Sequence, residues 1–153
     1  MSGAVQARLA ELGLTLPPPF QPVATYVGAV ATGGQVWISG MGPTWDTEIR
    51  YRGKVGRDLD LAAGQAAARL TALNLISHLE RALDGDLDRV RRCVKVFGLV
   101  NCAPDFAAAH RVIDAASAVL IDVFGAPHAR SITTAPGLPF QIAVELDAVF
   151  EVA

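Results

Sequence analysis

The sequence is poor in the residue types that build metal sites and disulfide frameworks. Only two of its 153 residues are cysteine and three are histidine. Cys93 and Cys102 do not have the spacing of a zinc or redox motif, and two cysteines are too few for a disulfide scaffold. The histidines are scattered, with His78 and His110 among polar helix neighbours and His128 just before an arginine. We therefore expect no metal site, with His78 and His110 at the surface and His128 in a structural role.

Charge is also scarce. Charged residues make up 18% of the chain, and 13 Lys and Arg against 15 Asp and Glu give a net charge of -2. This balance disfavours a nucleic-acid surface, which needs a basic excess, and the short cluster Arg89, Arg91 and Arg92 has no interleaved aromatic residues. No apolar run approaches the roughly 20 residues of a membrane span. Arg8 and Glu11 interrupt the N-terminal stretch, so no signal peptide is indicated and a cytoplasmic protein is expected.

What the sequence has in abundance is apolar side chains. Hydrophobic residues make up 52% of the chain, enough for one sizeable core, so we expect a single domain over residues 1–153. The low charged fraction suggests that other subunits cover part of the apolar surface. Trp37 and Trp45 suit either a core or an interface.

Periodicity predicts an α+β fold. A Gly33-Gly34 turn joins two strands at 25–31 and 35–39, and a loop over 41–60 includes a short strand near 49–51. Asp60 is a good N-cap for a helix that ends before Gly85, and Pro104-Asp105 opens a second helix. The remaining predicted elements are a helix over 5–12, strands at 91–100 and 129–134, and a final strand with apolar residues at alternate positions from 142 to 152. We expect a mixed sheet with two helices packed on one face and the other face open to solvent or to another subunit.

Arg130 and Glu145 are the candidate chemical residues. Arg130 opens a strand and Glu145 lies in the middle of the strand that follows the Pro-Gly-Leu-Pro turn, so an antiparallel pairing would bring them close together. A guanidinium can hold a planar carboxylate through two parallel hydrogen bonds, and a carboxylate can orient water or carry a proton. The alternative is an ordinary cross-strand ion pair on a wet sheet face.

Four stretches resemble one known family. They are Tyr26-Val27, Ile38-Ser39-Gly40, Asp105-Phe106 and the C-terminal run, in which A-R-S is followed by L-P and then by V-E-L-D-A. With these stretches the chain, over about residues 20–153, resembles the Rid family of imine deaminases, also called YjgF-like or L-PSP proteins. Residues 1–19, a helix and a proline-rich segment, form an N-terminal extension. The long 41–60 loop is typical of a divergent branch.

The resemblance implies a chorismate-mutase-like fold and a homotrimer whose open sheet faces line an inner barrel. It also implies three clefts between subunits, where small 2-imino or enamine acids are hydrolysed to 2-keto acids and ammonia without a metal or organic cofactor. According to the resemblance, Arg130 binds the substrate carboxylate, and Glu145 positions or activates the water that adds to the imine carbon. It places further substrate-binding residues at Tyr26, Ser39 and Gly40.

Two departures from the family pattern concern the pocket. Asp114 stands where the second helix of the family usually carries Asn, and a carboxylate there would compete for Arg130 or repel an anionic substrate. Ile132 stands two residues after Arg130, at a position where archetypal members of the family often carry Cys.

Two alternative functions stay open: a module that binds small carboxylates without turnover, and a protein that acts on RNA as a ribonuclease or translation inhibitor. The pocket walls are expected to include the 41–60 loop. Two roles are considered for the N-terminal helix: it caps either the cleft or the edge of the trimer.

Overall fold

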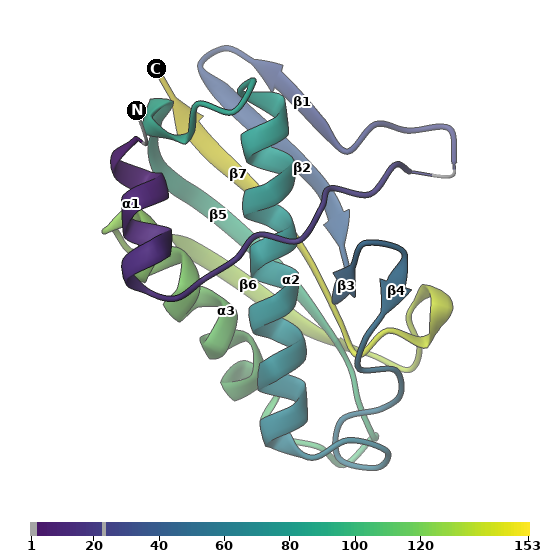
Figure 1. The fold of residues 1–153 in the computed structure, drawn as a ribbon. Coiled ribbons are helices and arrows are strands. Elements are labelled where there is room, and N and C mark those ends of the chain that lie inside the picture. Colours follow the sequence, from purple (N-terminus) through teal and green to yellow (C-terminus); the bar gives the residue numbers. More distant parts are fainter. Residues whose placement is uncertain (1–2, 23) are drawn as a thin grey trace.

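A five-stranded mixed sheet carries two helices, α2 and α3, on one of its faces (Figure 1). The computed structural model describes residues 3–22 and 24–153. Two short 3-10 turns at Leu87–Arg89 and Pro139–Gln141 supplement the main elements. These are, in chain order, α1 (Ala4–Glu11), β1 (Ala29–Thr32), β2 (Gln35–Met41), β3 (Thr44–Trp45), β4 (Glu48–Ile49), α2 (Leu61–Ala82), β5 (Val90–Asn101), α3 (Ala109–Phe124), β6 (Ala129–Ala135) and β7 (Val144–Val152).

The strands lie in the order β1-β2-β7-β5-β6. Only β5 and β6 run parallel, and the other neighbouring pairs are antiparallel. A parallel pair needs a crossover connection, which α3 provides. The α+β class and the two helices on one face are therefore as predicted, and β5 lies between the last two strands.

One bulge decides which side chains of β5 are buried. Strict alternation along the strand would place Val94 on the same face as the buried Val96. The register against β7 shifts between Cys93 and Lys95, so Cys93 takes the buried position and Val94 turns toward the open face. Burial raises the pKa of the Cys93 thiol to about 12, so this cysteine behaves as a small apolar side chain.

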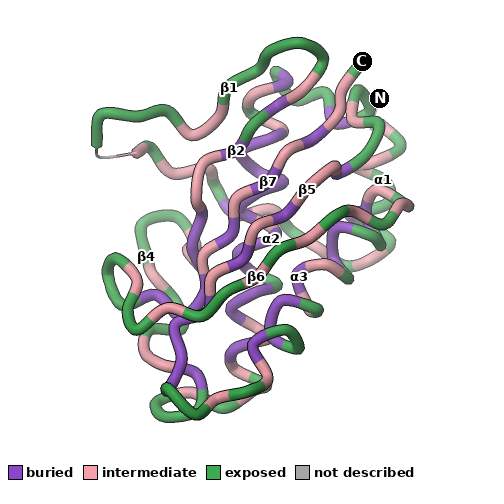
Figure 2. Tube along the Cα trace, turned by 180° about the vertical axis from the view of Figure 1, so that it is seen from behind, coloured by how far each residue is buried: buried purple, intermediate pink, exposed green. Residues whose placement is uncertain are grey.

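The second sheet face has no helix over it within the described residues, as the view from behind shows (Figure 2). Trp37 of β2 lies across from Val30 of β1 and Val149 of β7, and its exposed fraction is 54%. An apolar row of this kind on a sheet face without a helix is typical of a surface that another chain covers. No helix in the described part of the chain is long and apolar enough to cross a membrane.

The N-terminal extension packs back on the helical layer. Residues 14–22, here the N-terminal strap, cross α2, where the Ser77 hydroxyl donates a 2.6 Å hydrogen bond to the Pro17 carbonyl. The ring of Phe20 lies edge-on to His78, with centroids 5.3 Å apart. The prediction of a surface His78 is wrong because the strap covers it: only 3% of His78 is exposed. His110 is exposed as expected.

The two long helices begin differently. Asp60 caps α2 as predicted, since its carboxylate accepts a 2.8 Å hydrogen bond from the Ala63 amide. Pro104 and Asp105 instead form a turn, and α3 begins only at Ala109 without a side-chain cap. Asp105 therefore caps neither helix.

This difference gives a stability prediction. Replacing Asp60 by Ala leaves the Ala63 amide without its cap, so we expect the free energy of unfolding to fall by about 1 kcal/mol in a urea titration. Asp105→Ala removes the same charge near the other helix and is expected to change that free energy by less than about 0.5 kcal/mol. Equal losses in the two variants would contradict the capping role.

Candidate functional site

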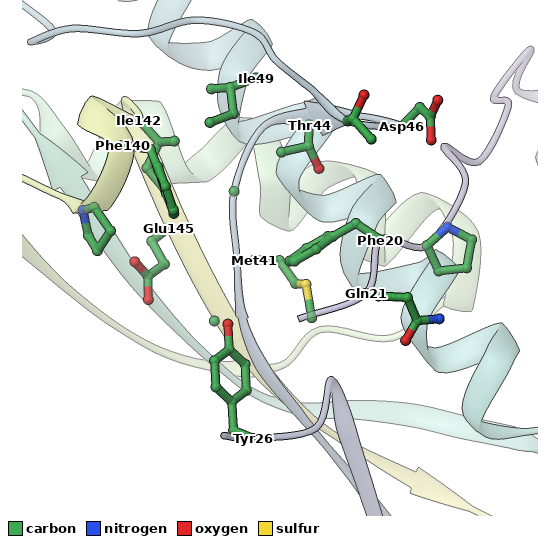
Figure 3. A pocket seen from close by; sticks show the side chains of 15 residues that line it. Phe20, Gln21, Tyr26, Met41, Thr44, Asp46, Ile49, Phe140, Ile142 and Glu145 are labelled. Atoms are coloured by element: carbon green, nitrogen blue, oxygen red, sulfur yellow. The ribbon is translucent and has the colours of Figure 1, made fainter. Parts of the chain in front are cut away.

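A pocket of about 660 Å³ opens where β2 ends and β7 begins (Figure 3). Its walls come from the N-terminal strap, the Tyr26 segment, β2, the β3–β4 hairpin, and the segment that leads into β7. A cavity of this size, walled mainly by apolar side chains with a few polar groups, is typical of small-molecule sites. The lining residues are Pro19, Phe20, Gln21, Tyr26, Gly40, Met41, Gly42, Thr44, Asp46, Thr47, Ile49, Pro139, Phe140, Ile142 and Glu145.

Glu145 is the carboxylate that β7 presents to this pocket. Its neighbours Val144 and Leu146 are fully buried against the helices, so the alternation of the strand turns Glu145 to the opposite face. Burial, and after it the negative charge of Asp147, raises the pKa of Glu145 above its ordinary value. Such a carboxyl holds and releases a proton closer to neutral pH than an exposed one does.

Gly40 makes room for this carboxylate. A Cβ atom at position 40 would overlap Oε1 of Glu145, closer than real Cβ atoms approach. The register between β2 and β7 also shifts between Ile38 and Met41, so the strand bulges where the carboxylate lies against it. Two of the predicted site residues, Gly40 and Glu145, therefore lie together, with the Glu145 side chain against the bare backbone of Gly40.

Tyr26 and Ser39 have different positions around the pocket. Tyr26 is half exposed and lines the pocket, as expected. Ser39 is not among the lining residues; its hydroxyl donates a 2.6 Å hydrogen bond to the Val27 carbonyl, and its amide donates to the carbonyl of Gly28. Ser39 thus fixes the segment that carries Tyr26.

The wall at Phe140 is built on strained backbone. Phe140 and Gln141 both have left-handed φ angles, 57° and 59°, and so does Tyr51 at 59°. Two contacts hold the turn: Arg52 Nη1 donates to the Phe140 carbonyl at 2.9 Å, and the Gly53 amide donates to the Gln141 carbonyl at 2.8 Å. Backbone strain that neighbours enforce in this way is common at ligand sites.

Arg130 lies at a different place, on the edge strand β6 against α3. Its Nη1 donates to Oδ1 of Asp114 at 2.8 Å and to Oγ of Ser117 at 3.1 Å. The Arg130 side chain is 24% exposed and that of Asp114 is 58% exposed. Nε2 of His128 lies 3.1 Å from the same Ser117 hydroxyl, and burial, followed by the charge of Arg130, lowers the pKa of His128.

The expected approach of Arg130 to Glu145 within one chain is wrong. Arg130 pairs with Val96 of β5, which pairs with Ala148 of β7, three residues beyond Glu145. The two side chains also lie on opposite faces of the sheet, because Arg130 contacts α3 whereas Glu145 faces away from the helices. The short turn after β6 suggested a hairpin, but the chain passes β5 before it pairs.

Several pocket walls were not predicted as site residues. The strap supplies Phe20 and Gln21, and the 41–60 loop supplies a small hairpin with strands at Thr44–Trp45 and Glu48–Ile49. The sequence predicts that this loop reaches the pocket. It also predicts a strand near 49–51, slightly later in the chain than the observed β4. The Pro17-Pro18-Pro19 run is the one signal for the strap, since it indicates stiff extended chain directed away from α1.

Comparison with known proteins gives a consistent assignment. The family profile described as "YjgF/chorismate mutase-like, putative endoribonuclease" matches residues 6–151. Protein TCP17 of Trypanosoma cruzi is 42% identical, covering 98% of this chain and 95% of its own. The Agrobacterium tumefaciens protein Atu1372, whose structure is solved and whose function is unknown, is 40% identical with a TM-score of 0.90, over 97% of this chain and 92% of that one.

More distant solved structures share the fold. A Shewanella oneidensis protein with the same endoribonuclease description has 29% identity and a TM-score of 0.93, covering 98% of this chain and all of that one. Escherichia coli TdcF, solved with bound serine, has 20% identity and a TM-score of 0.65 over 91% of this chain and 96% of that one. At that identity the likeness to TdcF concerns the fold.

The contact at Gly40 gives a prediction for the site. In Gly40→Ala the new methyl group forces the flexible Glu145 carboxylate aside, so ligand affinity or turnover should fall by about tenfold or more while the fold is kept. Gly137→Ala is the matched control, because a Cβ there meets nothing within 4 Å. Circular dichroism and ligand titration of both variants check this. Unchanged affinity and turnover in Gly40→Ala would contradict it.

The raised pKa of Glu145 gives a prediction for stability against pH. Between the ordinary value and the raised pKa, the folded state binds more protons than the unfolded state, so the wild-type protein loses stability as pH rises through this window. Glu145→Gln removes the titrating group. Its melting temperature should therefore match that of the wild type below pH 4 and exceed it at pH 8.

Asp147→Asn tests the cause of the shift, because it removes the like charge beside Glu145. In that variant we expect a smaller gain in melting temperature from Glu145→Gln at pH 8. A wild-type protein that is more stable than Glu145→Gln at pH 8 would contradict the assignment.

Proposed function

This chain belongs to the YjgF/chorismate mutase-like family, and we propose that it hydrolyses small 2-imino or enamine acids to 2-keto acids and ammonia in clefts between subunits. The observation that carries the proposal is Glu145, a half-buried carboxyl with a raised pKa, lying against Gly40 in an apolar pocket. A protonated imine is already electrophilic, so positioning and one proton carrier suffice for its hydrolysis.

The reaction balances with this group alone. Water adds to the imine carbon, forming a C–O bond while Glu145 takes one proton. Glu145 then returns that proton to the nitrogen of the amino alcohol, the C–N bond breaks to release ammonia, and the ammonia takes the hydroxyl proton as the keto group forms. Starting from the protonated imine, the products are the 2-keto acid and ammonium, and Glu145 is again a carboxylate.

Arg130 enters the proposal from a neighbouring subunit. Within one chain it lies on another strand and another face from Glu145, so it reaches the pocket only if subunits join. The apolar row of exposed Trp37 and Val30 with partly buried Val149 supports such an assembly, because it offers the apolar surface that a neighbouring sheet would cover. We propose a homotrimer in which the partner subunit's Arg130 grips the substrate carboxylate.

Asp114 positions this guanidinium in our proposal. The Asp114 carboxylate accepts a hydrogen bond from Nη1 of Arg130 only. Nε and Nη2 of Arg130 make no hydrogen bond within the described residues. That free edge is the fork that a carboxylate accepts through two parallel bonds. Asp114 also lowers the net positive charge at the clamp, so anionic substrates are held less strongly than by an unpaired arginine.

Two other functions use the same surfaces. A module that binds a small carboxylate without turnover would need the same pocket, and TdcF, of the same fold, binds serine. An RNA-acting role would need free basic groups. Arg89 instead donates two hydrogen bonds to the Ala153 carbonyl, and Arg92 donates one to the Pro127 carbonyl, so two of the three arginines of the basic cluster make structural contacts.

The test follows the decay of an imine generated in situ by an amino-acid oxidase. Wild-type protein should accelerate the decay, and Arg130→Ala should lower kcat/KM on the order of 100-fold, because a charged hydrogen-bond pair to the substrate is lost. Arg91→Ala removes an exposed arginine outside the site and should leave the rate unchanged. No acceleration by the wild-type protein would end the deaminase proposal, and keto-acid stabilisation that is lost in Arg130→Ala would then favour the binding module.

Co-expression of Arg130→Ala with Glu145→Gln tests whether the cleft lies between subunits. Each variant alone lacks one of the two groups. In randomly mixed trimers about a quarter of the clefts regain both groups, so about a quarter of the wild-type activity should return. Activity that stays at the level of the single variants would show that the two residues do not meet across an interface.

A further inference from the structure

We infer that the pocket beside Glu145 selects 2-imino acids with a bulky apolar side chain, branched or aromatic, and that Phe20 of the N-terminal strap forms the selecting wall. That the substrate is a 2-imino acid rests on the proposed function. The selectivity rests on the part of the pocket away from Glu145, which the proposed chemistry does not use.

The walls of the pocket are mostly hydrocarbon. Of the lining residues only Glu145 and Asp46 carry a carboxylate, and none carries a cation. The apolar part of the lining comprises Pro19, Phe20, Met41, Ile49, Pro139, Phe140 and Ile142. A volume of about 660 Å³ lies in the range that holds drug-sized ligands. A three-carbon imino acid would leave most of this apolar wall in contact with water, whereas a larger side chain would displace that water and gain free energy.

The pocket extends from Glu145 to the strap. In Figure 3 the β2 trace with Met41 passes between Glu145 and Phe140 on one side and Phe20 on the other. Gly40 and Gly42, on either side of Met41, both line the pocket without a side chain. The bare backbone at these two positions lets one cavity reach both sides of the strand end. A substrate whose carboxylate and imine carbon lie near Glu145 would direct its side chain toward Phe20.

The strap holds Phe20 firmly enough to act as a wall. Three consecutive prolines at 17–19 restrict the backbone just before it. The Ser77 hydroxyl holds the Pro17 carbonyl, and the Phe20 ring packs edge-on against the buried His78. A side chain that is anchored before binding loses little entropy when a ligand packs on it. Phe20 therefore belongs to a preformed surface.

The experiment compares kcat/KM for the imines generated from alanine, leucine and phenylalanine by an amino-acid oxidase. We expect wild-type protein to prefer the leucine and phenylalanine imines over the alanine imine by about tenfold or more. Phe20→Ala should lower this preference about tenfold, through a loss of kcat/KM for the leucine and phenylalanine imines, since only their side chains reach the strap. Phe20→Leu should restore most of the preference.

The control is Leu16→Ala, which removes an apolar contact of the same strap with the core but does not line the pocket. It should keep the preference. A loss in Leu16→Ala equal to that in Phe20→Ala would overturn the role of the Phe20 side chain. Equal rates for all three imines, or a preference for the smallest, would overturn the inference while leaving the proposed function standing.

A binding measurement separates the two proposals if no imine is hydrolysed. Thermal shifts with pyruvate, 4-methyl-2-oxopentanoate and phenylpyruvate then report on the pocket alone. Larger shifts with the two bulky keto acids, reduced in Phe20→Ala, would support the apolar selectivity although the deaminase activity had failed. Equal shifts with all three would overturn it.

Discussion

The alternation of side chains along β7 is the constraint on which the candidate site depends. Val144, Leu146, Ala148 and Phe150 are all buried beneath the helices, and a slip of one residue would expose all four to solvent. The register is therefore fixed by the core. The same register fixes Glu145 and Asp147 on the other face, partly removed from water and close to each other. The proton affinity of Glu145 is thus a consequence of how the core packs.

The sheet topology divides the candidate groups into two poles. The Glu145 pole comprises the pocket where β2 ends and β7 begins. The Arg130 pole lies on edge strand β6 beside α3. With β5 between these strands, no side-chain movement within one chain brings the guanidinium to the carboxylate. Any chemistry that needs both groups requires two copies of the chain. The oligomeric state and such a reaction are therefore linked, since a monomer holds the two groups on separate strands and opposite faces of the sheet.

The sequence predicts the parts of this fold that depend on local periodicity. The alternation in β7, the Gly33-Gly34 turn and the Asp60 cap are local patterns, and each appears as expected. The pairing of strands is not local, because a turn of the same length can lead to a neighbouring strand or pass over one. The expected hairpin therefore put Arg130 beside Glu145, although β5 lies between their strands, whereas Tyr26 and Gly40, which line one pocket with Glu145, were assigned through the family resemblance. The burial of His78 depends on a strap sixty residues earlier in the chain, and no pattern around His78 reveals it.

Several local energetic costs lie at or near the two poles. At the pocket, Glu145 is held near a like charge, and Phe140 and Gln141 are held in left-handed conformations. Nε2 of His78, beneath the strap, has no hydrogen-bond partner within the described residues. At the other pole Nδ1 of His128, next to Arg130, is also buried without a partner in that part of the chain. Stability alone would remove such features, since each costs free energy that a simple substitution would recover. Their occurrence near Glu145 and near Arg130, while the layer between α2, α3 and the sheet is packed with apolar side chains, marks both places as candidates for function.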